Sequence, residues 1–476
     1  MAETQANDLL LTSRSGRALF HEVAAPLPII DFHCHVDPQS VADDQRFGDI
    51  TDLWIRSDPY KWRAMRINGV SEAEITGAAS HSQKFHAWAR TLPLTVGSPL
   101  FHWSALELRQ VFGIESALAP TSASAIWDRC NTQLAQPGFS ARALLRKANV
   151  EVLCTSDDLL DSLASHAQMR LCPDASPLQM LPSLRADRVL TLDASTFAGF
   201  CKALSLATGI VVESLDAYKA AISKRLDAFD ALGCRFADVG LEQVVCELAP
   251  KWRVEQIFEE LLSGQTITPH AAAQLQTDLL LFLARQYHRR DWVMQMHLGA
   301  QRETSARLKN LTGRAGGYAC IGNSVDVSRL VALLNQLEQT EQLPRTLLFP
   351  LNPADMEMLA SVGGAFVEEG VPGKVQLGPA WWFNDHRDGM ERLLKVIGNL
   401  GLLSRHIGMT TDSRSLLSYS RHGYFRRILC NLLGSWADAG EIPNDMARLS
   451  KLVQDVCYFN AKRWMAPPSS IQLGSP

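Results

Sequence analysis

The sequence lacks any stretch of about 18 consecutive apolar residues, the length that a membrane-spanning helix requires. Its first residues also lack a basic segment followed by an apolar signal core. Charge of one sign is not in excess, because the net charge is −4 over 476 residues. Such a balance provides no electrostatic basis for binding nucleic acid or an anionic membrane. We therefore expect a cytoplasmic protein that binds neither nucleic acid nor membrane.

The sequence also lacks the signs of a disulfide framework or a cysteine-based site. Its ten cysteines are scattered, none forms a CxxC pair, and several lie within apolar runs, such as Cys154 in VEVLC and Cys246 in VVC. They resemble small core residues in a reducing compartment. There is no internal repeat and no low-complexity segment apart from PPSSIQLGSP at the carboxyl end. What remains is an ordinary globular composition, 46% hydrophobic and 20% charged, sufficient for a large core.

Short apolar runs typical of buried strands alternate along the chain with longer segments of helical pattern. Eight strands alternating with helices predict an α/β fold, a parallel (β/α)₈ barrel of the TIM type, whose catalytic groups lie at the carboxyl ends of the strands. The runs that we expect to form strands are residues 27–32, 150–155, 188–193, 234–239, 291–299, 345–351, 374–378 and 406–412.

The interval between the first two predicted strands exceeds a hundred residues. Within it, DLWIRSDPYKWRAMRI and PLFHWSALELRQVFGI carry aromatic residues and arginines at helical spacing. We therefore divide the chain into three parts. They are residues 1–39, an amino-terminal segment with the first strand; residues 40–145, a mostly helical insertion over the barrel mouth; and residues 146–476, the remainder of the barrel with carboxyl-terminal helices.

The first predicted strand ends in an Asp-Phe-His-Cys-His sequence. Positions two apart on a strand point the same way, so His33 and His35 should leave the strand side by side. Two neutral imidazole nitrogens at this separation can share a divalent metal ion. The alternative is a histidine pair within a satisfied hydrogen-bond network.

Two further polar residues follow other predicted strands. His297 ends the fifth and Asp412 ends the eighth, with Arg414 two residues later. Closure of a barrel brings the first and eighth strands together, so Asp412 should lie near the histidine pair. Three histidines and an aspartate suit a borderline divalent ion such as zinc, with positions left for water or substrate. The predicted metal ligands are His33, His35, His297 and Asp412.

Longer motifs carry a specific resemblance to a known family. HCH (33–35), MHLGAQR (296–302) and GMTTDSRSLLSYSRHGYFRRILCNLLG (408–434) resemble segments of the uronate isomerases, also called glucuronate isomerases, an atypical branch of the amidohydrolase superfamily. The similarity extends over nearly the whole chain, because YKWRAMR (60–66), PLFHWSALELR (99–109), CTSDD (154–158), WWFND (381–385) and GEIPND (440–445) also fit.

The resemblance implies interconversion of an aldehyde uronate with its 2-keto isomer, D-glucuronate with D-fructuronate and D-galacturonate with D-tagaturonate, without an organic cofactor. Such chemistry needs a base that moves a proton through an enediol, a group that polarises the carbonyl, and a cation that holds the carboxylate. The implied partner is a small uronate, and a homo-oligomer is compatible with the sequence. Two alternatives stay open: metal-dependent hydrolysis or decarboxylation on the same scaffold, and a silent relative that only binds sugar acids.

The resemblance also implies roles for individual residues. Asp412 and Tyr60 are the candidate proton-transfer groups, and Arg414 would stabilise developing negative charge or form an ion pair with Asp412. Tyr60 would need a lowered pKa to act as a base, which a nearby metal or arginine could provide. The substrate-binding candidates are Arg185, Trp381, Trp382 and Asp238, of which the tryptophan pair could equally serve packing alone.

Two positions depart from the family pattern. Pro59 stands in DPYKWR where the family commonly has a histidine, and Val239 stands in ADVGL where it has another. Proline and valine side chains neither donate, accept nor ligate. We therefore expect two polar contacts to substrate or metal to be absent, with weak activity, a shifted uronate preference or a different sugar acid as the consequence.

Overall fold

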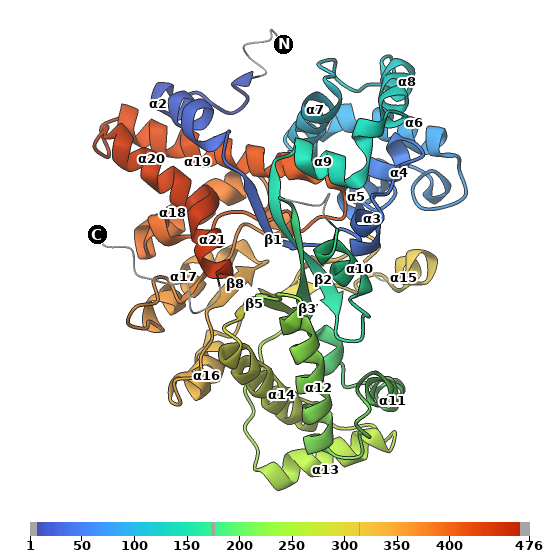
Figure 1. Cartoon of the computed structure of the whole chain (residues 1–476), viewed down its shortest axis with the longest axis vertical. Helices are drawn as coiled ribbons and strands as arrows, with labels where there is room; N and C mark the ends of the chain where they lie inside the picture. Colours follow the sequence, from blue (N-terminus) through green and yellow to red (C-terminus); the bar gives the residue numbers. More distant parts are fainter. Residues whose placement is uncertain (1–6, 173–176, 314, 467–476) are drawn as a thin grey trace.

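The computed structural model describes residues 7–172, 177–313 and 315–466. Its centre is a parallel sheet of seven strands that curls into a barrel in the order β1-β2-β3-β4-β5-β8-β9 (Figure 1). The strands are β1 Ile29–Cys34, β2 Val150–Asp158, β3 Gln179–Arg185, β4 Phe236–Leu241, β5 Val293–Leu298, β8 Thr346–Pro350 and β9 Val375–Leu377. Helices enclose the sheet, so the architecture is the predicted (β/α)₈ barrel.

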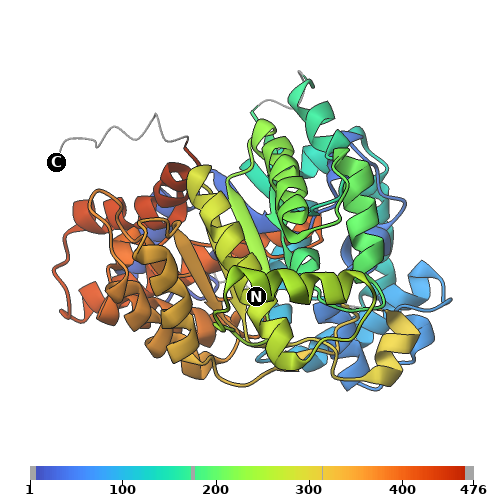
Figure 2. The same ribbon diagram turned by 90° about the horizontal axis from the view of Figure 1, so that it is seen from below.

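The helices that follow β2 to β9 cover the outside of the barrel. Figure 2 shows the strands enclosed between helices from the middle of the chain (green) and helices from its carboxyl-terminal part (orange to red). They are α10 Ala164–Arg170, α11 Phe197–Thr208, α12 Leu215–Ala231, α13 Lys251–Leu262, α14 Pro269–Arg289, α16 Val327–Glu338, α17 Met356–Ala365, α18 Arg387–Leu400, α19 Ser420–Asp438, α20 Met446–Gln454 and α21 Asn460–Met465. Helix α2, Arg14–Ala18, precedes the barrel and packs on α19.

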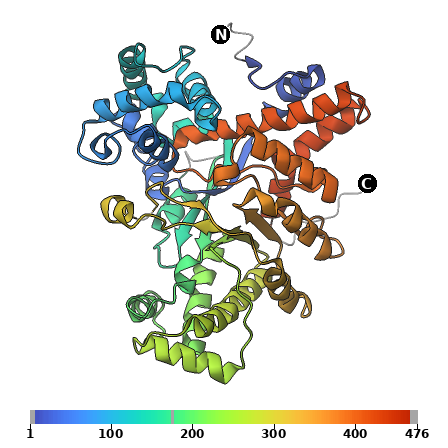
Figure 3. The same ribbon diagram turned by 180° about the vertical axis from the view of Figure 1, so that it is seen from behind.

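The chain between β1 and β2 forms helices and no strand within the described residues. They are α3 Pro38–Ala42, α4 Ile50–Trp54, α5 Pro59–Ile67, α6 His81–Thr91, α7 Pro99–Phe112, α8 Ala123–Leu134 and α9 Ala141–Lys147. Figure 3 shows them gathered on one side of the barrel, beside the excursion that follows β5. That excursion contains β6 Ala300–Gln301, α15 Ala306–Thr312 and β7 Cys320–Ile321. The division of the chain into three parts stays a prediction.

The third strand does not lie where the sequence predicted it. Residues 188–190 of the expected run lie in a 3₁₀ helix, Asp187–Leu190, and the strand is Gln179–Arg185 instead. Pro182 stands in the middle of this strand, and proline cannot donate to a ladder, so the segment does not have the pattern of a central strand. The structure accommodates it because β4 pairs with β3 only at Leu184 and Arg185, which leaves Pro182 without a second neighbour.

The eighth predicted strand, residues 406–412, is not a regular strand. Gly408 has φ +99, which an extended ladder does not allow, and a side chain there would collide with the Val456 carbonyl. The segment still closes the barrel against β1, because the Asp412 N–H donates to the His33 carbonyl at 3.1 Å and the His35 N–H donates to the Ser413 carbonyl at 2.9 Å.

A buried carboxylate completes this closure. Asp31 on β1 has no exposed surface and accepts hydrogen bonds from the Thr410 hydroxyl, the Thr411 N–H (2.8 Å) and the Thr411 hydroxyl. Side-chain bonding thus replaces the ladder that Gly408 interrupts, and it places the residues after Thr411 beside the end of β1.

Candidate active site

A cavity of about 380 Å³ opens at the carboxyl ends of the strands. Its walls come from β1, β3, β4, β5, the loop after residue 411 and helix α5 of the insertion. All the residues predicted for the site line it: His33, His35, Tyr60, Arg185, Asp238, His297, Trp381, Trp382, Asp412 and Arg414. The barrel places them together because inward positions at the carboxyl strand ends converge on one mouth.

The histidines after β1 converge on the carboxylate of Asp412. His35 Nε2 lies 3.0 Å and His33 Nε2 lies 3.3 Å from Asp412 Oδ1. The three donor atoms lie within 4.8 Å of one another, a spacing that one metal ion can bridge. The prediction that barrel closure brings Asp412 to the His-x-His pair is confirmed by this geometry.

A second donor set shares His33. It contains Asp238 on β4 and His297 on β5, and its donor atoms also lie within 4.8 Å of one another. His33 Nδ1 is 3.9 Å from Asp238 Oδ1, and the rings of His33 and His297 are 4.9 Å apart. Asp238 was predicted as a substrate contact, and the structure adds that it can serve as a metal donor.

The donor groups influence one another's protonation. Burial opposes the charge of Asp412, but hydrogen bonds from His33 and His35 outweigh it and hold the pKa of the Asp412 carboxyl well below its usual value. Burial, with His33 adding to it, lowers the pKa of His297 well below its usual value. Burial also lowers the pKa of His35, so neutral imidazoles face an ionised carboxylate. For His33, the nearby Asp238 and Asp412 outweigh burial and raise the pKa.

The donor chemistry fits a divalent metal ion. His33 Nδ1 and His297 Nε2 are buried and have no hydrogen-bond partner within the described residues. Buried polar atoms are normally satisfied, so two orphaned imidazole nitrogens in one cavity indicate a missing partner that accepts lone pairs. Imidazole nitrogens with carboxylate oxygens are ligands of borderline divalent ions. The site can therefore hold a borderline divalent ion, and the donor atoms do not distinguish one such ion from another.

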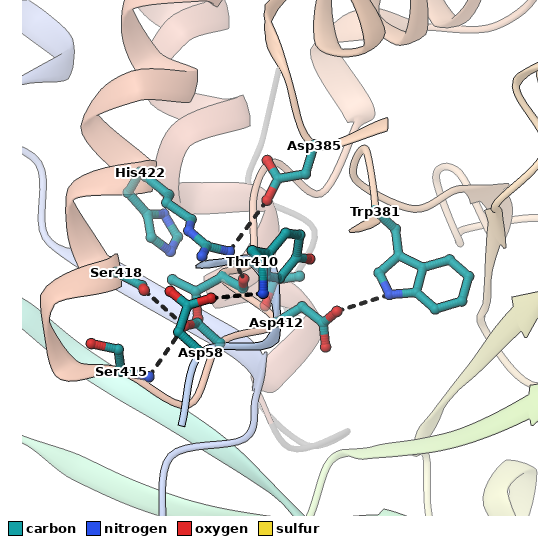
Figure 4. Close-up of polar contacts among 12 residues, drawn as sticks. Asp58, Trp381, Asp385, Thr410, Asp412, Ser415, Ser418 and His422 are labelled. Carbon is teal, nitrogen blue, oxygen red and sulfur yellow. Dashed lines mark hydrogen bonds and ion pairs between the residues drawn. The ribbon is translucent and has the colours of Figure 1, made fainter. Parts of the chain in front are cut away.

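Asp412 is held in an uncommon backbone conformation. Its φ is +46, in the left-handed region that residues other than glycine rarely adopt. The indole Nε1 of Trp381 donates to Asp412 Oδ2 at 2.9 Å (Figure 4), so it holds the carboxylate oxygen that the two histidines do not contact. Trp381 also packs on His297 with ring centroids 4.7 Å apart. The Trp381 side chain therefore orients site residues as well as packing.

Tyr60 reaches the cavity from the first turn of α5. Asp58 caps this helix by accepting from the Tyr60 N–H at 2.9 Å, and Pro59 occupies the first helical position. Burial, followed by the charge of Asp412, raises the pKa of the Tyr60 phenol well above its usual value, although Arg421 acts in the opposite direction. A lowered pKa, the condition for Tyr60 to act as a base, is not met, so its phenol is neutral and can donate a hydrogen bond.

The cavity contains guanidinium groups for an anionic substrate. Arg185 is oriented by Asp187, whose Oδ2 lies 2.8 Å from both Nε and Nη2 of the arginine. Arg414 lines the cavity and forms no hydrogen bond or ion pair within the described residues, so it is not the ion-pair partner of Asp412.

Arg302 also lines the cavity, 5.7 Å from the ring of Trp382, and the sequence interpretation missed it. It stands at the end of MHLGAQR, five residues after His297, and its place in that motif was the available signal.

The two departures from the family pattern lie in different environments. Pro59 lines the cavity, as expected, so a side chain at this position faces the site. The expectation that position 239 also faces the site is wrong, because Val239 is 5% exposed and packs in the main apolar core. Asp238 takes the inward position on β4, and the alternation of side chains along a strand directs Val239 to the surrounding helices.

A (β/α)₈ barrel with histidines and carboxylates gathered at its mouth is the arrangement of a barrel enzyme, whose active site lies at the carboxyl ends of the strands. The glucuronate isomerase family model matches residues 1–465. The chain belongs to the glucuronate isomerase family. Within the described residues no helix is long and apolar enough to cross a membrane.

Similar proteins cover almost the full chain. The uronate isomerases of Salmonella paratyphi B and Salmonella typhimurium are 45% identical over 467 residues, covering 98% of this chain and 99% of theirs. Two crystal structures are similar throughout. The uronate isomerase of Thermotoga maritima has a TM-score of 0.91 and 30% identity, covering 97% of this chain and 99% of its own. The glucuronate isomerase of Caulobacter crescentus has a TM-score of 0.87 and 26% identity, covering 96% of each chain.

Proposed function

We propose that this protein is an aldose–ketose isomerase of uronates, which interconverts D-glucuronate with D-fructuronate and D-galacturonate with D-tagaturonate. Family membership supports the reaction class. The observation that carries the proposal for this chain is that an ionised carboxylate, a neutral phenol, several guanidinium groups and a metal-donor set line one cavity. Isomerisation of a uronate needs a base, a group that polarises the carbonyl and a cation for the carboxylate, and this cavity contains candidates for all three.

The proton transfer falls to Asp412. In the aldose-to-ketose direction, isomerisation moves a proton from C2 to C1 through an enediol, while O1 gains a proton and O2 loses one. A carboxylate that is held ionised can accept this proton and return it. Tyr60, with its raised pKa, donates a hydrogen bond to the substrate oxygen on which negative charge develops. Arg414, which has no hydrogen-bond or ion-pair partner in the part of the chain that the structure describes, stabilises the same charge.

The substrate carboxylate is held by Arg185. Its guanidinium is oriented by Asp187 and presents planar donors suited to a carboxylate. Trp381 and Trp382 shape the sugar pocket beside it.

The metal ion in this proposal is one zinc per chain. His33, His35, His297 and Asp412 would hold it, with Asp238 adjacent, and the ion supplies Lewis acidity toward substrate oxygens when bound. Metal analysis of the purified protein should find about one equivalent of divalent ion. His297→Ala should lower that content, whereas His166→Ala, a buried histidine outside both donor sets, should not.

Turnover of each uronate by the purified protein tests the reaction. Proton NMR should show the 2-keto isomer growing in as the aldehyde uronate disappears. Carbon dioxide release or hydrolysis would favour the metal-dependent alternative. Binding of uronate by calorimetry without turnover would favour a silent sugar-acid-binding relative. Either result would overturn the proposal.

The proposed setting is cytoplasmic, with the uronate as the partner of this protein. All ten cysteines are free of disulfides, which supports a reducing compartment. Light scattering of the purified protein tests whether it forms a homo-oligomer.

A further inference from the structure

A fully buried arginine lies directly behind the cavity. Arg421 on α19 is 1% exposed and does not line the cavity. Its guanidinium donates to the Thr411 carbonyl at 3.2 Å and lies 3.4 Å from Asp385 Oδ2. The same group lies 3.9 Å from the ring centroid of Trp103 and 5.0 Å from that of Tyr60.

These contacts connect three separate segments of the site. Tyr60 begins α5 of the insertion. Asp385 follows the Trp381–Trp382 pair by a few residues, and Thr411 immediately precedes Asp412. One rigid cation therefore joins the element that carries the phenol, the segment that carries the tryptophans and the loop that carries the carboxylate.

The surroundings of Arg421 explain why a charge can stay buried there. Asp58 and Glu107 are buried close by and share Lys61, whose Nζ is 2.5 Å from Asp58 Oδ2 and 3.9 Å from Glu107 Oε2. Asp385 is the acidic group that contacts Arg421 directly, at 3.4 Å, and burial raises the pKa of its carboxyl to about 7. Acidic groups thus surround the two cations, as the burial of paired charges requires.

We propose that Arg421 is a positioning residue that sets the distance between the Tyr60 phenol and the Asp412 carboxylate. The inference rests on the proposed isomerase function. A guanidinium suits this place because its flat face stacks on aromatic rings while its edge donates to a carbonyl and a carboxylate; an ammonium cannot do both. Relaxing it lets α5 and the loop at Thr411 move apart, and proton transfer is sensitive to such displacements.

The test compares three variants with the wild type. Arg421→Lys keeps the charge and removes the planar contacts. Arg421→Gln with Asp385→Asn removes both charges, so that no unpaired charge is left buried. Arg427→Gln is the matched control, because Arg427 lies on the same helix, is buried, stacks 4.2 Å from the ring of Phe20 and contacts no site residue.

We expect kcat to fall about 10-fold in Arg421→Lys and about 10²-fold in the neutral double variant, as a displacement of about 1 Å in the site would cause. KM and bound metal should stay near the wild-type values, because Arg421 touches neither the cavity nor the metal donors. The Arg427→Gln control should keep its kcat whatever its unfolding temperature. If the neutral double variant fails to fold, Arg421→Lys decides by the same measurement.

A double-mutant cycle with Tyr60→Phe tests the route of the effect. If Arg421 acts through the phenol, the combined loss in Tyr60→Phe/Arg421→Lys is smaller than the product of the single losses. Multiplicative losses, or unchanged kcat in both Arg421 variants, would overturn the inference. So would an equal loss in the Arg427 control. Failure of the proposed function is distinct, because then the wild type itself shows no uronate turnover.

Discussion

The barrel closure at Asp31 leads to a stability prediction that the structure makes quantitative. Asp31→Asn keeps the shape of the side chain and removes its charge. One oxygen of Asp31 accepts from the Thr410 hydroxyl and the Thr411 N–H, and the other accepts from the Thr411 hydroxyl. The amide retains a single acceptor oxygen and turns a donor toward one of these donors.

The expected cost follows from these bonds. A hydrogen bond to a charged group contributes roughly 1.5–3 kcal/mol, and Asp31→Asn loses one such bond and weakens two others. We therefore expect the free energy of unfolding to fall by about 2–4 kcal/mol. Metal affinity should fall as well, because the bonds of Asp31 place the segment that leads into Asp412.

Urea unfolding followed by tryptophan fluorescence, with and without added zinc, measures both effects. Asp388→Asn is the control, since this aspartate is exposed on α18. Thr411→Val should reproduce part of the loss by removing one of the three donors. Wild-type stability and metal affinity in Asp31→Asn would refute the reasoning, and the closure would then depend on backbone contacts alone.

Three further predictions concern the cavity and its border. Asp412→Asn should lower turnover by about 10²–10⁴-fold, the usual range for a positioned general base, and near-normal turnover with metal bound would show that Asp412 is a ligand only. Pro59→His should improve uronate binding by about 1–3 kcal/mol if the missing contact limits it, and KM measures this effect; efficient wild-type turnover that Pro59→His does not improve would contradict it. Val239→His should instead lower the unfolding temperature in a thermal unfolding experiment, because it buries an imidazole in the core. Burial raises the pKa of Asp157 to about 8 from 3.8, so its contribution to stability is complete below about pH 4 and is lost as the pH rises through about 8. Asp157→Asn should therefore flatten the decline of the unfolding free energy between about pH 7 and 8. In this range the neighbouring His166 stays neutral, because burial holds its pKa at about 4. An unchanged decline would show that other groups cause the pH dependence.

Much of the site could be predicted from local sequence pattern. The His33-x-His35 spacing at the end of an apolar run, His297 after a second run and Asp412 after a third are read from one strand at a time, since strand alternation needs no tertiary information. The barrel rule then places the strand ends together. The four predicted metal donors accordingly line one cavity.

Other features escaped prediction because they depend on neighbours distant in the chain. The third strand was misplaced since Pro182 is tolerated only where β4 leaves it unpaired. Val239 was taken for a site position, although the orientation of β4 directs it into the core. The direction of the Tyr60 pKa follows from its depth of burial, which no local pattern reports.

The sequence by itself determined most of the strand runs, the place of the candidate metal donors at strand ends and the family, because these reside in short-range periodicity and contiguous motifs. Tertiary structure alone decided how the barrel closes and how the proton-transfer groups are held. Asp31 and Thr411 are 380 residues apart, and Arg421 joins α5 to the loop before Asp412. Such contacts form only when the chain has folded, since their energies depend on burial and on distances that no segment contains alone.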